Sequence, residues 1–271
     1  APISTKMSSR LNMPLKPSLC IVGNLEHADF REAAELLRRD GRIVTDDAAP
    51  ELIVIAQVTP GQFAEHKIRA LQRQWPLAGM IGLLGTWCEG EPRTGRPWPG
   101  VQRLYWYEFP AWWHRQLVLR AAGRCPDWAR PCDGIERNLP NVDCAGHGLI
   151  IVSTPVRETF EVLADVLHQA GYASLWRHTG RPLPFVHGAV AGVWDGGQLD
   201  DLETVDFADF CRECARHQAP VIAILDFPRR DRVDLARDLG AAVVLGKPWL
   251  NADLAATIHR LTGVRAVFRA A

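Results

Sequence analysis

The chain has 271 residues, and its 31 basic side chains balance 31 acidic ones, so its formal net charge is zero. A hydrophobic content of 47% with 23% charged residues is typical of a globular protein and excludes a disordered or collagen-like chain. Zero net charge removes the general attraction that nonspecific nucleic-acid binding needs, so we expect no nucleic-acid partner. The length suits two domains better than one.

The composition also predicts a compartment. No apolar run approaches the ~20 residues of a membrane-spanning helix, and the first residues are polar, unlike a secretory signal. Seven cysteines form an odd set spread through the chain, which favours a reducing environment over a disulfide framework. We therefore expect a cytoplasmic protein with no membrane partner.

The first half of the chain alternates short apolar runs with stretches of helical spacing. Its predicted strands are residues 19–22, 42–45, 52–56, 80–84 and 104–107, and its predicted helices are residues 30–39, 65–74 and 111–122. Short apolar runs of this kind are typical of buried parallel strands, and Gly41 follows the first helix as a stop signal. This order predicts an α/β domain.

The second half repeats the order. Its predicted strands are residues 148–153, 172–176, 189–194, 220–225 and 242–245, and its predicted helices are residues 157–170, 207–216, 233–239 and 252–261. We therefore expect an α/β protein with two flavodoxin-like, doubly wound parallel sheets of five strands in tandem. The predicted organisation is a tail (1–17), a first domain (18–122), a linker (123–146), a second domain (147–263) and a tail (264–271).

Two positions at the ends of predicted strands in the second half give a resemblance to a known family. Asp195 ends the third strand, and Lys247 with Pro248 follows the fifth. Their order and interval resemble the receiver domains of bacterial response regulators (CheY-like), in which this aspartate is the phosphoacceptor. The resemblance covers about residues 147–263 and implies a role in two-component signalling.

The second half departs from the receiver pattern where phosphorylation needs metal ligands. Phosphoryl transfer to a carboxylate needs Mg²⁺, and Mg²⁺ needs carboxylate oxygens. Receivers have an acidic pair after the first strand, where this sequence has Ser153 and Thr154, and their switching hydroxyl falls next to Asp226. We therefore expect a degenerate receiver (pseudo-receiver) without Mg²⁺, in which Asp195 and Lys247 form a partly buried ion pair.

The first half resembles a receiver in topology alone. Gln57 ends its third strand, and Phe109 with Pro110 stands near the place of the Lys-Pro pair, with no lysine. Fold alone does not give function, so this half supports no phosphorylation chemistry by itself.

Residues 85–100 form a long insertion between the fourth and fifth strands of the first half. Loops at the carboxyl ends of parallel strands form the usual binding crevice, and Trp and Arg are favoured at interaction hot spots. The candidate partner-binding or ligand-binding residues here are Trp87, Glu89, Glu91, Arg93, Arg96 and Trp98. The alternative is that the insertion packs on its own domain, with Glu89 or Glu91 paired to Arg93 or Arg96.

Cysteines suggest two further chemistries, both of which we regard as the weaker interpretation. The predicted linker contains a set of possible zinc ligands, Cys125, Cys132, Cys144 and His147. These residues lack the tight Cys-x2-Cys knuckle of common zinc sites, so we expect no metal and no cofactor. Cys88 is expected to be a small buried hydrophobe rather than a thiol nucleophile.

These observations favour a non-catalytic signal-transduction protein with tandem pseudo-receiver domains. It would act through protein–protein interaction, with a protein partner or with a second copy of itself. Two alternatives stay open: a phosphorylatable response-regulator receiver that uses Asp195, and a small-molecule enzyme or ligand-binding protein that uses residues 85–100.

Overall fold

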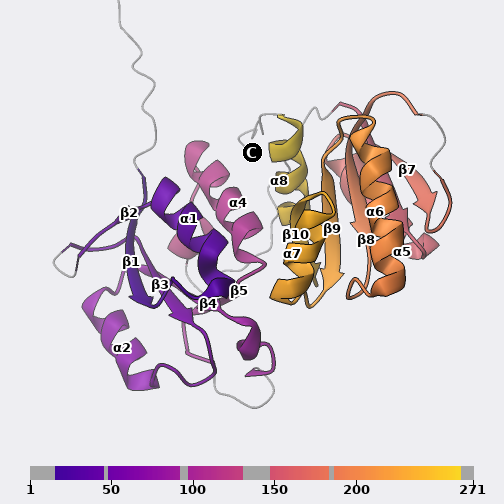
Figure 1. Ribbon diagram of the computed structural model, residues 1–271. Helices are drawn as coiled ribbons and strands as arrows, with labels where there is room; N and C mark the ends of the chain where they lie inside the picture. The colour runs from indigo at the N-terminus through magenta and orange to yellow at the C-terminus, as the bar shows by residue number, and fades with distance from the viewer. Residues whose placement is uncertain (1–15, 46–47, 92–96, 131–146, 183–185, 264–271) are drawn as a thin grey trace, which may run out of the picture.

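Two α/β domains lie side by side in the computed structural model, which describes residues 16–45, 48–91, 97–130, 147–182 and 186–263 (Figure 1). Each domain contains a five-stranded sheet in which all the strands run parallel. The tandem α/β fold expected from the sequence is therefore confirmed.

The first domain has the strand order β2-β1-β3-β4-β5. Its strands are β1 (Ser18–Gly23), β2 (Arg42–Ile43), β3 (Leu52–Gln57), β4 (Gly79–Leu84) and β5 (Gln102–Tyr105). Its helices are η1 (Ala28–Phe30), α1 (Arg31–Asp40), α2 (Glu65–Gln74), η2 (Thr86–Cys88), α4 (Phe109–Ala121) and η3 (Asp127–Ala129).

The second domain has the order β10-β9-β8-β6-β7, which is the same 2-1-3-4-5 order within the domain. Its strands are β6 (Leu149–Thr154), β7 (Ala173–His178), β8 (Ala189–Asp195), β9 (Val221–Asp226) and β10 (Ala241–Lys247). Its helices are α5 (Arg157–Gln169), α6 (Asp201–Ala215), α7 (Arg230–Asp238) and α8 (Asn251–Thr262).

Strand β3 shows why the strands read as continuous apolar runs. All six of its residues are buried, because helices cover both faces of the sheet. Leu52 and Val54 face the core that α1 and α4 cover, whereas Ile53 and Ile55 face α2. Successive side chains of a strand point to opposite faces, so this apolar strand contributes to the hydrophobic core on both sides of the sheet.

Helix α6 begins at Asp201, six residues before the sequence-based start. The capping box explains the earlier start, since Asp200 accepts from the N–H of Glu203 and the Glu203 side chain accepts from the N–H of Asp200. With 15 residues, α6 is the longest helix in the described segments, and no helix there is long and apolar enough to cross a membrane. Described residues 179–182 and 186–188, between β7 and β8, contain no helix.

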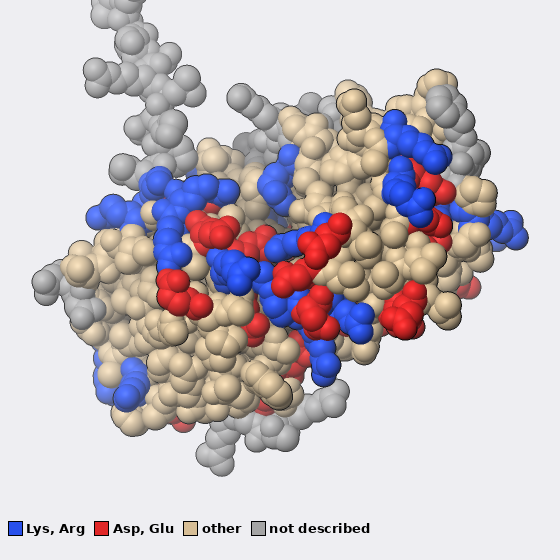
Figure 2. All heavy atoms as spheres, viewed as in Figure 1, with Lys and Arg blue, Asp and Glu red and all other residues tan. Residues whose placement is uncertain are grey.

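The two domains dock through α4 of the first and α8 of the second (Figure 1). Arg115 of α4 donates to Asp253 of α8 at 2.6 Å, and the Tyr107 ring lies so close to Gly246 of β10 that a Cβ there would come within 2.4 Å of it. Charged side chains of both signs gather along the boundary of the domains in Figure 2. Arg237 of α7 also pairs with Glu32 of α1 at 2.5 Å. Buried apolar residues of both domains also belong to one continuous hydrophobic cluster.

The first residues of the segment predicted as a linker pack on the first domain. Trp128 of η3 is buried and stacks on Trp113 of α4, with ring centroids 5.6 Å apart. Its carbonyl would lie 2.2 Å from a Cβ at Gly79, so glycine at the start of β4 is what allows this approach.

Candidate functional site

The carboxyl ends of β6, β8, β9 and β10 bring together the side chains that the sequence singles out in the second domain. Lys247 Nζ lies 2.8 Å from Asp195 Oδ1 and 3.1 Å from Asp226 Oδ1, and it donates to the Gly196 carbonyl at 2.7 Å. Thr154 Oγ1 donates to the other oxygen of Asp195, also at 2.8 Å. The ammonium thus has three acceptors, and both oxygens of Asp195 are engaged.

This pair is partly buried, as the sequence predicts. Asp195 is 9% exposed, while the Lys247 side chain is 30% exposed. Burial lowers the pKa of Lys247, but its hydrogen bonds to Asp195 and Asp226 and their negative charges outweigh burial and raise that pKa overall. The lysine is therefore a permanent counter-charge at neutral pH.

The two hydroxyl residues that end β6, Ser153 and Thr154, bond to different neighbours. Thr154 donates to Asp195, whereas the Ser153 hydroxyl accepts from Arg177 at 3.0 Å. Asp226, the carboxylate at the end of β9, is paired with Lys247. Thr154 thus offers Asp195 a hydroxyl donor at a position where phosphorylation would need an acceptor for a divalent cation.

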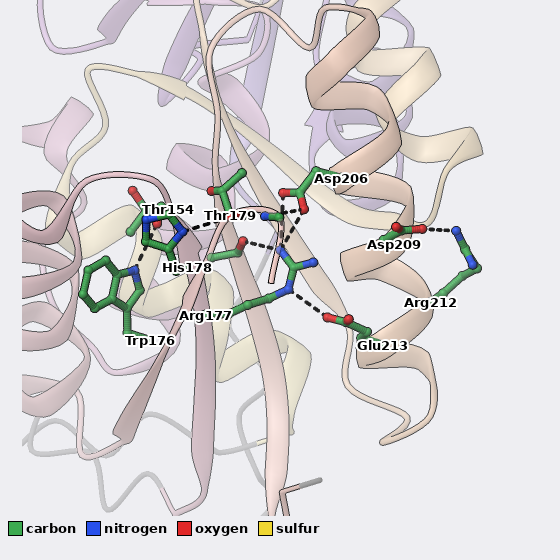
Figure 3. A network of polar contacts seen from close by, with 11 residues as sticks. Thr154, Trp176, Arg177, His178, Thr179, Asp206, Asp209, Arg212 and Glu213 are labelled. Atoms are coloured by element: carbon green, nitrogen blue, oxygen red, sulfur yellow. Dashed lines mark hydrogen bonds and ion pairs between the residues drawn. The ribbon is translucent and has the colours of Figure 1, made fainter. Parts of the chain in front are cut away.

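A second polar network, missed by the sequence analysis, joins β7 to α6 (Figure 3). The Arg177 side chain is 3% exposed, and its guanidinium donates to Glu213 at 2.8 Å, to Asp206 at 3.1 Å and to the Ser153 hydroxyl. It also lies over the Phe210 ring, 5.4 Å from the centroid. The sequence signal for this network was weak. It consisted of two carboxylates seven positions apart on one helix and an arginine in a strand.

The insertion contributes Glu91 to the interior of its own domain. Glu91 is buried and accepts from Arg103 of β5 at 2.7 Å and from Gln57 Nε2 at 3.2 Å. Its partner is therefore Arg103, which the sequence analysis did not name. Gln57, at the end of β3, holds Glu91 in the place where the second domain has its Asp195–Lys247 pair.

The indoles of the insertion separate into two environments. Trp87 in η2 is 75% exposed, whereas Trp98 is partly buried and meets the Phe63 ring edge-on at a centroid distance of 6.3 Å. Arg93 and Arg96 lie outside the described residues. Trp87 is thus the one indole of the pair that a partner can reach without rearranging the domain.

The described cysteines are distributed over both domains, with Cys20, Cys88 and Cys125 in or beside the first and Cys211 and Cys214 on α6 of the second. Burial is the largest of the effects that raise the pKa of Cys88, so its thiol stays protonated at neutral pH, as expected of a small buried hydrophobe. Cys125 and His147 are exposed, and Cys132 and Cys144 lie outside the described residues. Within the described ranges, no group of three or more His, Cys, Asp or Glu residues could hold a metal ion.

A cleft of about 390 Å³ opens where the first domain meets the loop after β9. Glu89 from the insertion lines one side, and Asp226, Phe227 and Arg229 line the other, with Gln198 from the loop after β8. The sequence analysis placed Glu89 in a recognition loop. Only the docking of the domains shows that it faces the second domain's crevice.

The fold and crevice define this chain as a tandem pair of receiver-like α/β domains, structurally similar to CheY-like receivers. No protein-family model matches the sequence, and no curated protein matches it. The structure is similar to the receiver domain of a signal transduction histidine kinase from Syntrophus aciditrophicus, at 19% identity over 46% of this chain and 97% of that one (TM-score 0.36). It is also similar to a CheY-like response regulator from Mesorhizobium loti, at 17% identity over 42% of this chain and 99% of that one (TM-score 0.34).

A third similarity spans both domains. A two-component response regulator with a GGDEF domain matches at 11% identity over 92% of this chain and 98% of that one, with a TM-score of 0.38. The fold assignment rests on the strand order of the two sheets rather than on these scores.

Proposed function

We propose that this chain is a non-enzymatic signalling protein whose two pseudo-receiver domains act by binding a protein partner or a second copy of the chain. The observation that carries the proposal is the pair of hydroxyl residues, Ser153 and Thr154, beside Asp195. Thr154 donates to one of its oxygens at 2.8 Å, and Ser153 accepts from Arg177, so hydroxyl groups stand where Mg²⁺-dependent phosphorylation would need carboxylate ligands. The corresponding position of the first domain holds Gln57, which has no nucleophilic carboxylate.

A phosphodonor experiment tests the loss of phosphorylation. The full chain is incubated with acetyl phosphate and Mg²⁺, and its intact mass is measured. We expect no added phosphoryl group. A stable single adduct that Asp195→Asn abolishes and that Asp226→Asn leaves in place would refute the pseudo-receiver part of the proposal and favour a working receiver.

The binding part of the proposal centres on Trp87. An indole that is 75% exposed on a short 3-10 turn is the kind of side chain that forms interaction hot spots. Cys88, the next residue, is buried and holds the turn against the domain. Replacing Trp87 should therefore weaken binding without loosening the fold.

Self-association gives a direct readout. Light scattering coupled to size exclusion compares the wild type, Trp87→Ala and Leu77→Ala, because Leu77 is an even more exposed apolar residue of the same domain. If the chain pairs with itself through this turn, Trp87→Ala alone shifts the population to monomer. A partner isolated with the wild type should likewise be lost only in Trp87→Ala, by about 2 kcal/mol of binding free energy. Equal behaviour of both variants would contradict the assignment of Trp87.

A further inference from the structure

The cleft between the domains contains two groups of opposite charge that are not paired with each other. Glu89 Oε1, from the first domain, is shielded from solvent and accepts no hydrogen bond in the described part of the chain. Arg229, from the second domain, precedes α7 and forms no ion pair with any described residue. Burial raises the pKa of Glu89, and the positive charge of Arg229 opposes that effect, so each group acts on the other across the cleft.

The remaining charged groups of the cleft have partners within the protein. Asp226 is 3.1 Å from Lys247, and Arg232 donates to the Leu199 carbonyl at 3.0 Å while lying 3.5 Å from Asp231. These contacts leave Glu89 and Arg229 as the charges that a ligand would meet, one on each wall.

We propose that this cleft binds a small zwitterion of the α-amino acid class, with its ammonium group on Glu89 and its carboxylate on Arg229. A volume of about 390 Å³ is within the range of small-molecule sites, which is roughly 300–1,000 Å³. A guanidinium fork matches a carboxylate through two parallel hydrogen bonds, and a carboxylate accepts well from an ammonium.

A ligand with one charge fits this cleft less well. A simple anion on Arg229 would leave the Glu89 carboxylate without a counter-charge, and a simple cation on Glu89 would leave Arg229 without one. Each opposite charge adds a favourable Coulomb interaction, so a ligand that offers a counter-charge to both groups gains over either half of it. The neighbouring charges of an α-amino acid satisfy both at once.

Phe227 supplies the apolar part of the site. Its ring is 58% exposed at the rim of the cleft, and its backbone has φ of 41°, a left-handed conformation that bulky residues rarely adopt. Strained residues of this kind cluster at sites that clamp ligands. The ring can cover the aliphatic or aromatic side chain of a bound amino acid.

Binding would bridge the two domains beside the Asp195–Lys247 pair, because Asp226 lines the cleft and contacts Lys247. A bound ligand would thus hold the two domains in their docked arrangement. This inference does not depend on whether the protein is phosphorylated or on the partner of Trp87.

Calorimetric titration of the full chain with blocked and free ligands tests the charge pattern. L-phenylalanine and L-glutamine are compared with their N-acetyl forms, which lack the ammonium, and with their carboxamides, which lack the carboxylate. We expect a free amino acid to bind, and either blocking group to weaken it at least tenfold. Glu89→Gln and Arg229→Gln should each cause a similar loss.

A matched control separates the site from general charge effects. Arg69→Gln removes an exposed arginine from α2, on the far side of the first domain, and should leave the affinity unchanged (Figure 1). The inference is overturned if the blocked forms bind as tightly as the free ones, if Arg69→Gln weakens binding as much as Arg229→Gln, or if none of the standard amino acids binds at concentrations up to about 10 mM. If a variant unfolds, the blocked ligands on the wild-type chain decide the question.

Discussion

Replacing Lys247 by Met should destabilise the second domain by about 2 kcal/mol. Methionine keeps most of the apolar stem but removes the ammonium, so the Asp195 carboxylate retains only the hydrogen bond from Thr154. Breaking a fully buried ion pair costs about 3–5 kcal/mol, and losing an exposed one costs about 1 kcal/mol or less. Asp195 is nearly buried, whereas Lys247 is 30% exposed, which places the expected loss between these limits. Asp226 is half-exposed and is rehydrated, so it adds little.

A double-mutant cycle with Asp195→Asn measures the coupling. Urea unfolding is followed by circular dichroism and by tryptophan fluorescence, and coincident curves establish a two-state transition. Because Asp195→Asn removes the negative charge, adding Lys247→Met to that variant should cost much less than adding Lys247→Met to the wild type. We expect a coupling free energy of about 1–2 kcal/mol. Additive effects, within about 0.5 kcal/mol, would show that the ion pair does not contribute to stability, and the placement of Asp195 and Lys247 as a coupled pair in one crevice would lose its energetic support.

Three further changes test other parts of the structure. Arg177→Met removes a buried guanidinium from two partly buried carboxylates and should lower the free energy of unfolding by about 3 kcal/mol; a loss below about 1 kcal/mol would contradict the network. Burial lowers the pKa of His114 to about 4, so below about pH 6.5 the unfolded chain binds a proton at this residue that the folded chain does not bind. Between pH 7 and pH 5 the free energy of unfolding of the wild type should therefore fall by about 2 kcal/mol more than that of His114→Gln, measured by urea unfolding of both proteins at each pH. Gly246→Ala drives a methyl group toward the Tyr107 ring and should destabilise the docked pair by about 1–3 kcal/mol, whereas Gly90→Ala, which meets nothing within 4 Å, should be nearly neutral in the same thermal unfolding assay.

The early start of α6 shows what the sequence analysis missed at a local level. The apolar spacing placed the helix from residue 207, but the first turns carry exposed residues such as Leu202 and Val205 and show no regular apolar stripe. Asp200 and Glu203 have the spacing of a capping box, so this boundary was available in the sequence. Local hydrogen bonds fixed it, without help from the rest of the fold.

The sequence predicted only some of the ion pairs. Asp195 and Lys247 could be placed together because each ends a strand of one predicted parallel sheet, and parallel strands present their carboxyl ends at one edge. In the structure these strands, β8 and β10, lie on either side of β9. One of the two alternatives for the insertion pairs Glu89 or Glu91 with Arg93 or Arg96, which lie outside the described residues, and the structure adds a partner for Glu91 in Arg103 of β5. A long side chain in a loop selects its partner by the distance and depth that the packed domain offers, and neither is encoded in spacing along the chain.

The sequence by itself determined the elements and their repetition, because the periodic burial of apolar residues is a local property of strands and helices. It also determined which residue types stand at the strand ends. Only the tertiary structure decided that Arg115 and Tyr107 dock the two domains, and that Glu89 faces Arg229 across a cleft. Docking depends on the complementary shapes of two folded surfaces. Residues far apart in the sequence form these surfaces, so docking produces no periodic pattern along the chain.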